Sequence, residues 1–133
     1  NAGGVTDGPL ILRALADQGR RDGLLWWVTE DVRIRAHVRD SLGALLPKVV
    51  RGHGADTSAV LAITHWLHGD GVRANTAVER GIEDDPQHRL VNLLGLAITA
   101  GMPPRVWCES MADLSFETCR RGVIPVERDH QSV

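Results

Sequence analysis

Two histidines with the spacing of a metal-binding pair are the first candidates for chemistry. His65 and His68 lie three residues apart in a segment with helical periodicity, so both imidazoles can face one ion. Asp70 could add a carboxylate oxygen as a third ligand, and a further ligand would have to come from elsewhere, such as His37 or His53. Because no recognised zinc signature is present, two partly exposed helix histidines near a turn are the favoured interpretation.

A basic region offers a second kind of chemistry, contact with nucleic-acid phosphates. Its candidate residues are Arg33, Arg35, Arg39 and Arg51. Asp31 stands four residues before Arg35 and Asp40 interrupts the run, which favours a salt-bridged, solvated face instead. The formal charge of -2 gives no general attraction to phosphates, and no known nucleic-acid-binding signature is present. Nucleic-acid binding is therefore a disfavoured alternative.

The thiols and paired carboxylates do not form a convincing catalytic set. Neither Cys108 nor Cys119 lies in a known nucleophile motif, so both are interpreted as reduced, small apolar residues. The adjacent carboxylates are best explained by helix ends, although Asp84 falls at a helix C-terminus, where a negative charge is mildly unfavourable. The sequence predicts no catalytic residue and no cofactor.

The tryptophans are candidates for a partner contact. On a helix, the adjacent Trp26 and Trp27 would point about 100° apart, so both cannot face the same core layer. One of them is expected to be exposed or to cover an interface.

Helical periodicity dominates the elements that must position these residues. Helices are predicted over about 9–19, 29–45 with a break near Pro47, 58–68, 71–84, 86–100, 104–112 and a short segment ending at Gly122. Expected caps are Asp56 or Thr57, then Asp70, then Asp85 with Pro86 at the first helical position. The run 24–28 fits helix or strand, and helix is favoured because no partner strand is visible.

These patterns predict an all-α fold, an irregular bundle of about six to seven helices, with the segment after Pro86 central to the core. Residues 3–122 are expected to form a single helical domain and 123–133 a loose tail. Residues 1–2 are interpreted as a tag remnant and the whole chain as a fragment of a longer protein. With 133 residues, the chain can bury one sizeable core.

The stretch from Ala55 to His88 is 34 residues long and resembles one tetratricopeptide repeat. The positions that match are the turn Gly69-Asp70, the small residues Ala74 and Gly81, the apolar Val78 and Ile82, and Pro86. The first helix departs from the pattern at Ser58, Ala62 and His65. The resemblance implies a groove that includes Ile63 and Trp66, although these positions are so apolar that the N-terminal helices are expected to cover them.

A second resemblance covers a longer part of the chain. Trp66-Leu-His-Gly-Asp-Gly, Ala77-Val-Glu-Arg, Asp85-Pro86 and Gly101-Met-Pro-Pro together resemble the C-terminal half of an actinobacterial family of domains of unknown function. That family has no established activity, so the resemblance implies a relative and no function.

The leading hypothesis is a non-enzymatic helical interaction or structural module in a larger bacterial protein. Its expected partner is another protein or the remainder of its own parent chain, and a second copy of the chain is a further candidate. The alternative is an accessory part of an enzyme whose active site lies mainly outside this fragment, with His65, His68 or Asp70 contributing. No apolar run approaches the roughly 18 residues that span a bilayer, so a cytoplasmic location is expected.

Overall fold

The computed structural model describes residues 8–112. Over these residues the chain forms seven α-helices and one 3-10 turn, with no strand. In chain order they are α2 (Gly8–Ala16), α3 (Gln18–Glu30), α4 (Val32–Leu45), η1 (Leu46–Lys48), α5 (Ala55–Leu67), α6 (Gly71–Asp84), α7 (Arg89–Thr99) and α8 (Arg105–Ala112). The all-α prediction is confirmed, whereas the predicted helix ending at Gly122 and the predicted tail lie outside the described residues.

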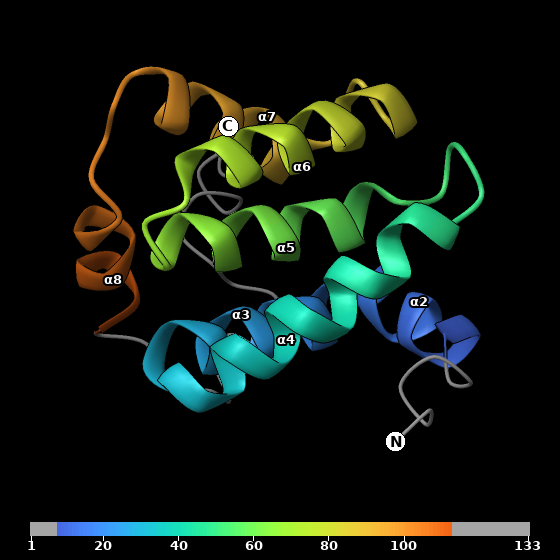
Figure 1. Cartoon of the computed structure of the whole chain (residues 1–133), viewed down its shortest axis with the longest axis horizontal. Helices are drawn as coiled ribbons and strands as arrows, with labels where there is room; N and C mark the ends of the chain where they lie inside the picture. The colour runs from blue at the N-terminus through green and yellow to red at the C-terminus, as the bar shows by residue number, and fades with distance from the viewer. Residues whose placement is uncertain (1–7, 113–133) are drawn as a thin grey trace.

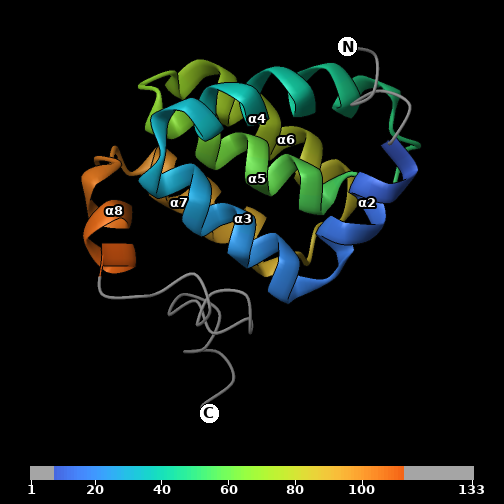
Figure 2. The same cartoon turned by 90° about the horizontal axis from the view of Figure 1, so that it is seen from below.

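Helix α5 lies at the centre of the bundle. In Figure 1 it runs between α6 and α7 on one side and α3 and α4 on the other, while α2 and α8 lie at opposite ends (Figure 2). Every residue of α5 except Asp56 and Leu67 is buried. A helix that is apolar around its whole circumference has to be enclosed by other helices, and the sequence of α5 has that character.

The sequence-based choice of the central helix was wrong. The segment after Pro86 was expected to hold that place, but α7 buries only Leu90, Val91 and Leu94, and Leu96 on its outer side is largely exposed. Helix α7 covers one side of α5 and α6 and is itself open to solvent on the other.

A sharp turn joins α5 to α6. Gly69 adopts φ +80°, a left-handed conformation that favours glycine and ends α5. Asp70 then caps α6, because its side chain accepts a hydrogen bond from the backbone N–H of Arg73 at 3.0 Å. The predicted helical hairpin and its cap are therefore present.

The N-terminal helices begin and end at aspartates. Asp17 caps α3 and Asp31 caps α4, each through its side-chain oxygen. Two predicted boundaries were therefore wrong. One helix was expected to end near Gly19 and the next to begin near Thr29, whereas α3 continues past Gly19 through residues 24–28 and stops before Asp31. The ambiguous apolar run 24–28 is helical, and Pro47 lies in the 3-10 turn that follows α4.

Two predicted N-caps were also wrong. Helix α5 begins at Ala55 after Gly54, with no side-chain cap, and Asp56 lies in its first turn. Helix α7 begins at Arg89, and His88 caps it by accepting from the N–H of Val91. Asp85 instead accepts the N–H of Gln87, forming a turn that delays the start of the helix by three residues.

Helix α8 is held against α3 by a buried hydrogen bond. The indole Nε1–H of Trp107 donates to Thr29 Oγ1 at 2.7 Å, and that hydroxyl donates to the carbonyl of Leu25 at 2.8 Å. Both Trp107 and Thr29 are buried, so each needs such a partner. Cys108 beside them is half-buried, and burial raises the pKa of its thiol.

The close packing of α6 against its neighbours at Gly81 generates a stability prediction. A Cβ added at Gly81 of α6 would lie 2.9 Å from both γ-carbons of Val91 and 3.1 Å from Cβ of Ser58. We therefore expect Gly81→Ala to destabilise the protein by about 1–3 kcal/mol through overpacking, measured by urea denaturation.

Gly43 supplies the matched control, because a Cβ there would meet nothing within 4 Å and the residue is inside α4. Gly43→Ala should raise stability by about 0.5–1 kcal/mol, since alanine favours the helix. Equal effects of the two substitutions would contradict the proposed close packing at Gly81.

Candidate functional site

The histidines of the predicted metal site are mostly buried. His65 is 8% exposed, and its Nδ1 and the Nε2 of His68 are buried without a hydrogen-bond partner. The carboxylate of Asp70 caps α6 and contacts the guanidinium of Arg73 at 3.3 Å. Within residues 8–112 no three His, Cys, Asp or Glu side chains gather as a metal site would require.

Burial also controls the charge of these histidines. Removal from water lowers the pKa of His65, although the nearby Asp70 works in the opposite direction. Burial, together with the positive charges of Arg39 and Arg35, lowers the pKa of His68. Both rings are therefore neutral near pH 7, and His65 contributes no positive charge to its surroundings.

The four residues proposed for an interaction surface separate into two groups. Trp26 and Trp27 form an edge-to-face pair with ring centroids 5.1 Å apart, and Trp27 is 39% exposed while Trp26 packs partly against the core. Their expected divergence is confirmed. Ile63 and Trp66 are core residues of α5, so assigning them to a surface was wrong. The N-terminal helices α3 and α4 cover α5, as the apolar character of the α5 positions predicted.

The arginines of the predicted nucleic-acid surface mostly contact the protein itself. The guanidinium of Arg35 donates to the carbonyls of Val28 and Thr29 at 2.9 Å each. These carbonyls lie in the last turn of α3, where they have no partner within the helix. The expected ion pair with Asp31 does not form, because that carboxylate caps α4.

The predicted salt-bridged face is present only in part among the other arginines. Arg39 pairs with Asp40 at 3.1 Å and Arg51 with Glu83 at 2.7 Å. Arg33 is exposed on α4. Three of the four predicted phosphate-binding side chains thus have intramolecular partners.

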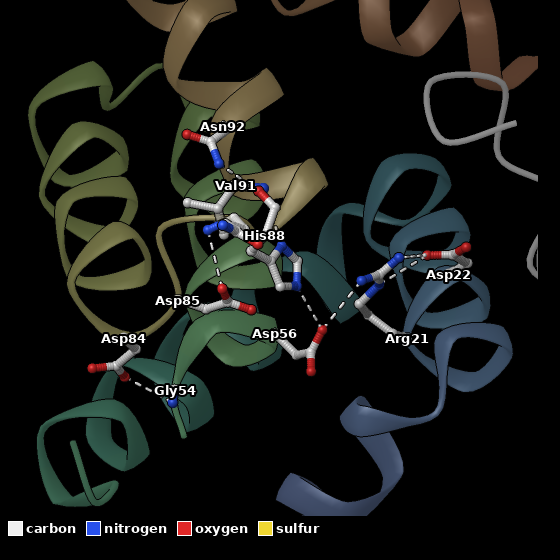
Figure 3. A network of polar contacts seen from close by, with 10 residues as sticks. Arg21, Asp22, Gly54, Asp56, Asp84, Asp85, His88, Val91 and Asn92 are labelled. Atoms are coloured by element: carbon white, nitrogen blue, oxygen red, sulfur yellow. Dashed lines mark hydrogen bonds and ion pairs between the residues drawn. The ribbon is translucent and has the colours of Figure 1, made fainter. Parts of the chain in front are cut away.

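A partly buried polar network joins three helices near the start of α5 (Figure 3). Arg21 of α3 is buried and donates to Asp22 at 3.0 Å and to Asp56 of α5 at 3.1 Å. His88 Nε2 lies 2.8 Å from the same oxygen of Asp56. The network was missed by sequence reasoning, since its members are 35 and 32 residues apart and share no local motif.

The Asp56–His88 contact connects the start of α7 to α5. His88 Nδ1 accepts the backbone N–H of Val91, so Nε2 carries the proton and donates it to Asp56. Both ring nitrogens are therefore occupied. Burial opposes ionisation of Asp56, but the hydrogen bonds from His88 and Arg21 and the positive charge of Arg21 outweigh it and hold the pKa of Asp56 below its ordinary value.

A second network connects the loop before α5 to the end of α6. Asp84 accepts the backbone N–H groups of Gly52 at 3.0 Å and Gly54 at 2.7 Å, and Arg80 Nε at 2.9 Å. Arg80 also donates to the carbonyls of Leu46 and Val49. These contacts compensate the negative charge of Asp84 at the C-terminus of α6, a position where a carboxylate was expected to be mildly unfavourable. Burial raises the pKa of Asp84, but the hydrogen bonds from Gly52, Gly54 and Arg80 prevail and lower it.

An open groove of about 550 Å³ is lined by residues of α4, α5, α6 and the 3-10 turn η1. Figure 1 shows α5 between α4 and α6. Its lining comprises Arg39, Asp40, Gly43, Leu46, Pro47, Leu61, His65, Arg73, Thr76, Ala77 and Arg80. Most of the accessible lining is apolar, and the charged side chains come from the two walls. This volume is in the range of ligand-binding sites. Sequence reasoning had named Arg39 and His65 for other roles and had not placed them together.

Comparison with known families decides where the chain belongs. Residues 9–105 match a family described as Domain of unknown function (DUF4192). The chain belongs to this family. No curated protein and no solved structure matches the chain. The match starts within α2 and ends at the start of α8, so the DUF4192 domain includes the N-terminal helices that cover α5. The actinobacterial origin and the tetratricopeptide-like character of the hairpin stay predictions.

The Asp84 network in the DUF4192 domain gives a pH-dependent prediction. Asp84→Asn should cost about 2–4 kcal/mol near neutral pH, because the buried Arg80 and two N–H groups lose a charged acceptor. A lowered folded-state pKa means that this stability is fully present above the ordinary value of 3.8 and is lost as the pH falls through the folded value.

Urea denaturation of wild type and Asp84→Asn between pH 7 and pH 2.5 measures this difference. The exposed Glu83, which pairs with Arg51, provides the control, and Glu83→Gln should cost under about 1 kcal/mol. A difference between wild type and Asp84→Asn that persists unchanged to the lowest pH would contradict the assigned role of the carboxylate.

The Asp56–His88 contact is tested by a double-mutant cycle. Asp56→Ala and His88→Ala should show a coupling of about 1 kcal/mol in unfolding free energy, since the two side chains share one hydrogen bond. Arg73 lies beyond the opposite end of α5, so Asp56→Ala and Arg73→Ala should be additive to within about 0.5 kcal/mol. Additivity in the first pair would show that the contact contributes nothing.

Proposed function

We propose that this DUF4192 domain is a non-enzymatic helical interaction module, and that the groove between α4 and α6 is its contact surface. The groove supports the proposal because it combines an apolar floor with polar walls on two separate helices. Such a combination is typical of sites that take a side chain or a short segment from a partner.

The charged clusters that link helices support the same proposal. Asp56, His88 and Arg80 each contact other groups of the fold, in arrangements that link helices or loops. These groups therefore have a structural explanation that does not involve a substrate. The partner is another protein or the remainder of the parent chain, in a cytoplasmic setting. In residues 8–112, no helix is both long and apolar enough to span a membrane.

A selection with a blocked groove tests this function. Gly43 lines the groove with open space around it, so Gly43→Trp places an indole there. Ala44→Trp adds the same side chain at an exposed neighbouring position outside the lining. Circular dichroism of both variants should match the wild type.

A phage-displayed library of random peptides is then selected on the wild-type chain. We expect enriched peptides to bind the wild type and Ala44→Trp and to lose at least about tenfold in affinity for Gly43→Trp. The proposal fails if no peptide is enriched, or if the enriched peptides bind both tryptophan variants equally.

A further inference from the structure

Two histidines lie on the side of α5 that faces α4 and the groove. The ring of His65 lines the groove and is 8% exposed, and His68 follows, half-buried, at the C-terminus of α5. Nδ1 of His65 and Nε2 of His68 are buried without a hydrogen-bond partner. A neutral imidazole carries its proton on one nitrogen only, so the buried nitrogen can remain a bare acceptor. A second proton would place an N–H group there, and a buried N–H without an acceptor is costly.

The charges around His65 also oppose a second proton on its ring. Arg39 of α4 and Arg73 of α6 line the groove with it, and both disfavour a positive charge there. Asp70 favours that charge, but its carboxylate already caps α6 and contacts Arg73 at 3.3 Å. Asp40 likewise contacts Arg39 at 3.1 Å. Because each aspartate already has its arginine, a protonated His65 would have to compete for a counterion.

The surroundings of His68 have the same effect on the α4 side. Burial and the positive charges of Arg39 and Arg35 disfavour a charged ring, whereas the backbone of Arg35 and the carboxylate of Asp40 favour it less strongly. The guanidinium of Arg35 is held by two carbonyls at the end of α3, so it cannot turn away without losing both hydrogen bonds. Protonation of the two rings would therefore add two positive charges to one contact between α4 and α5.

Of the two helices beside α5 at the groove, α4 is the one that can move away. Helix α6 follows α5 through the sharp turn at Gly69, approaches it closely at Gly81, and packs against it more extensively than α4 does. Arg80 of α6 donates to two carbonyls in residues 46–49, which fixes the segment just after α4. Separation is therefore expected in the turns of α4 that lie beside the two histidines.

We propose that His65 and His68 make the contact between α4 and α5 a proton-sensitive joint. The joint is closed while both rings are neutral, and their protonation in mild acid separates α4 from α5 and exposes the apolar floor of the groove. This joint goes beyond the proposed function, because it concerns the domain alone and needs no partner. The two proposals can therefore fail independently.

The direction of the pH effect follows from the proton balance. Burial, together with the neighbouring arginines, lowers the pKa of both rings below the ordinary value of 6.5, so the closed form binds fewer protons than an open form. The stability of the closed joint is fully present above this ordinary value and is lost as the pH falls through it toward the lower values of the folded rings. Opening is therefore expected between about pH 7 and pH 5.

Hydrogen exchange followed by NMR measures this opening helix by helix. The wild type is studied at about pH 7 and pH 5 in the presence of EDTA, with a correction for the intrinsic effect of pH on amide exchange. Amides of α4 should lose at least about tenfold in protection at the lower pH, because they then exchange through the open form. Amides in the contact between α6 and α7 should keep their protection to within about twofold. The ring nitrogens of His65 and His68 should titrate over the same pH range.

Two matched double variants locate the sensor. His65→Leu with His68→Leu removes both rings and keeps apolar side chains in their place, so the protection of α4 should change by less than about twofold between the two pH values. His37→Leu with His53→Leu removes two exposed histidines and should keep the full response of the wild type. Circular dichroism checks the fold of each variant, and the ring titration of the wild type tests the joint without any substitution.

Four results would overturn the proposal. They are unchanged protection of α4 at pH 5, an equal loss of protection in all helices, equal responses of the two double variants, and a titration midpoint of His65 above the ordinary 6.5. None of these results bears on peptide binding by the groove, which the library selection tests separately.

Discussion

The burial of α5 on every side is the constraint on which the rest of the fold depends. Only Asp56 and Leu67 in this helix escape burial, so α3, α4, α6 and α7 must all pack around it. Because α4 and α6 each contact this central helix, they are held apart and leave a groove whose lining includes Leu61 and His65 of α5. The same constraint removes Ile63 and Trp66 from any surface role.

Buried charge in this domain is compensated locally and holds elements together. Arg21 of α3 and the α7 N-cap His88 both contact Asp56, and Asp84 with Arg80 connects α6 to the loop before α5. A buried charge without a partner would cost several kcal/mol, so the fold requires these contacts. Arg39 and Arg73 on the groove walls, by contrast, form exposed ion pairs that add little to stability.

Several local features were predictable because short-range chemistry decides them. Gly69-Asp70 ends one helix and caps the next, and the divergence of Trp26 and Trp27 follows from helical geometry alone. The predictions failed where more than one local partner was available. Asp31 could pair with Arg35 or cap α4, and in the structure its carboxylate accepts the backbone N–H groups of α4.

By itself, the sequence of this DUF4192 domain determined an all-helical chain, its turns and the helices with apolar faces, because periodicity and capping act over a few residues. It also indicated that the N-terminal helices would cover α5. Only the tertiary structure decided which residues from distant segments meet. The Asp56–His88 pair, the Asp84 network and the groove each depend on relative helix positions, which are set by packing across the core and not by local propensity.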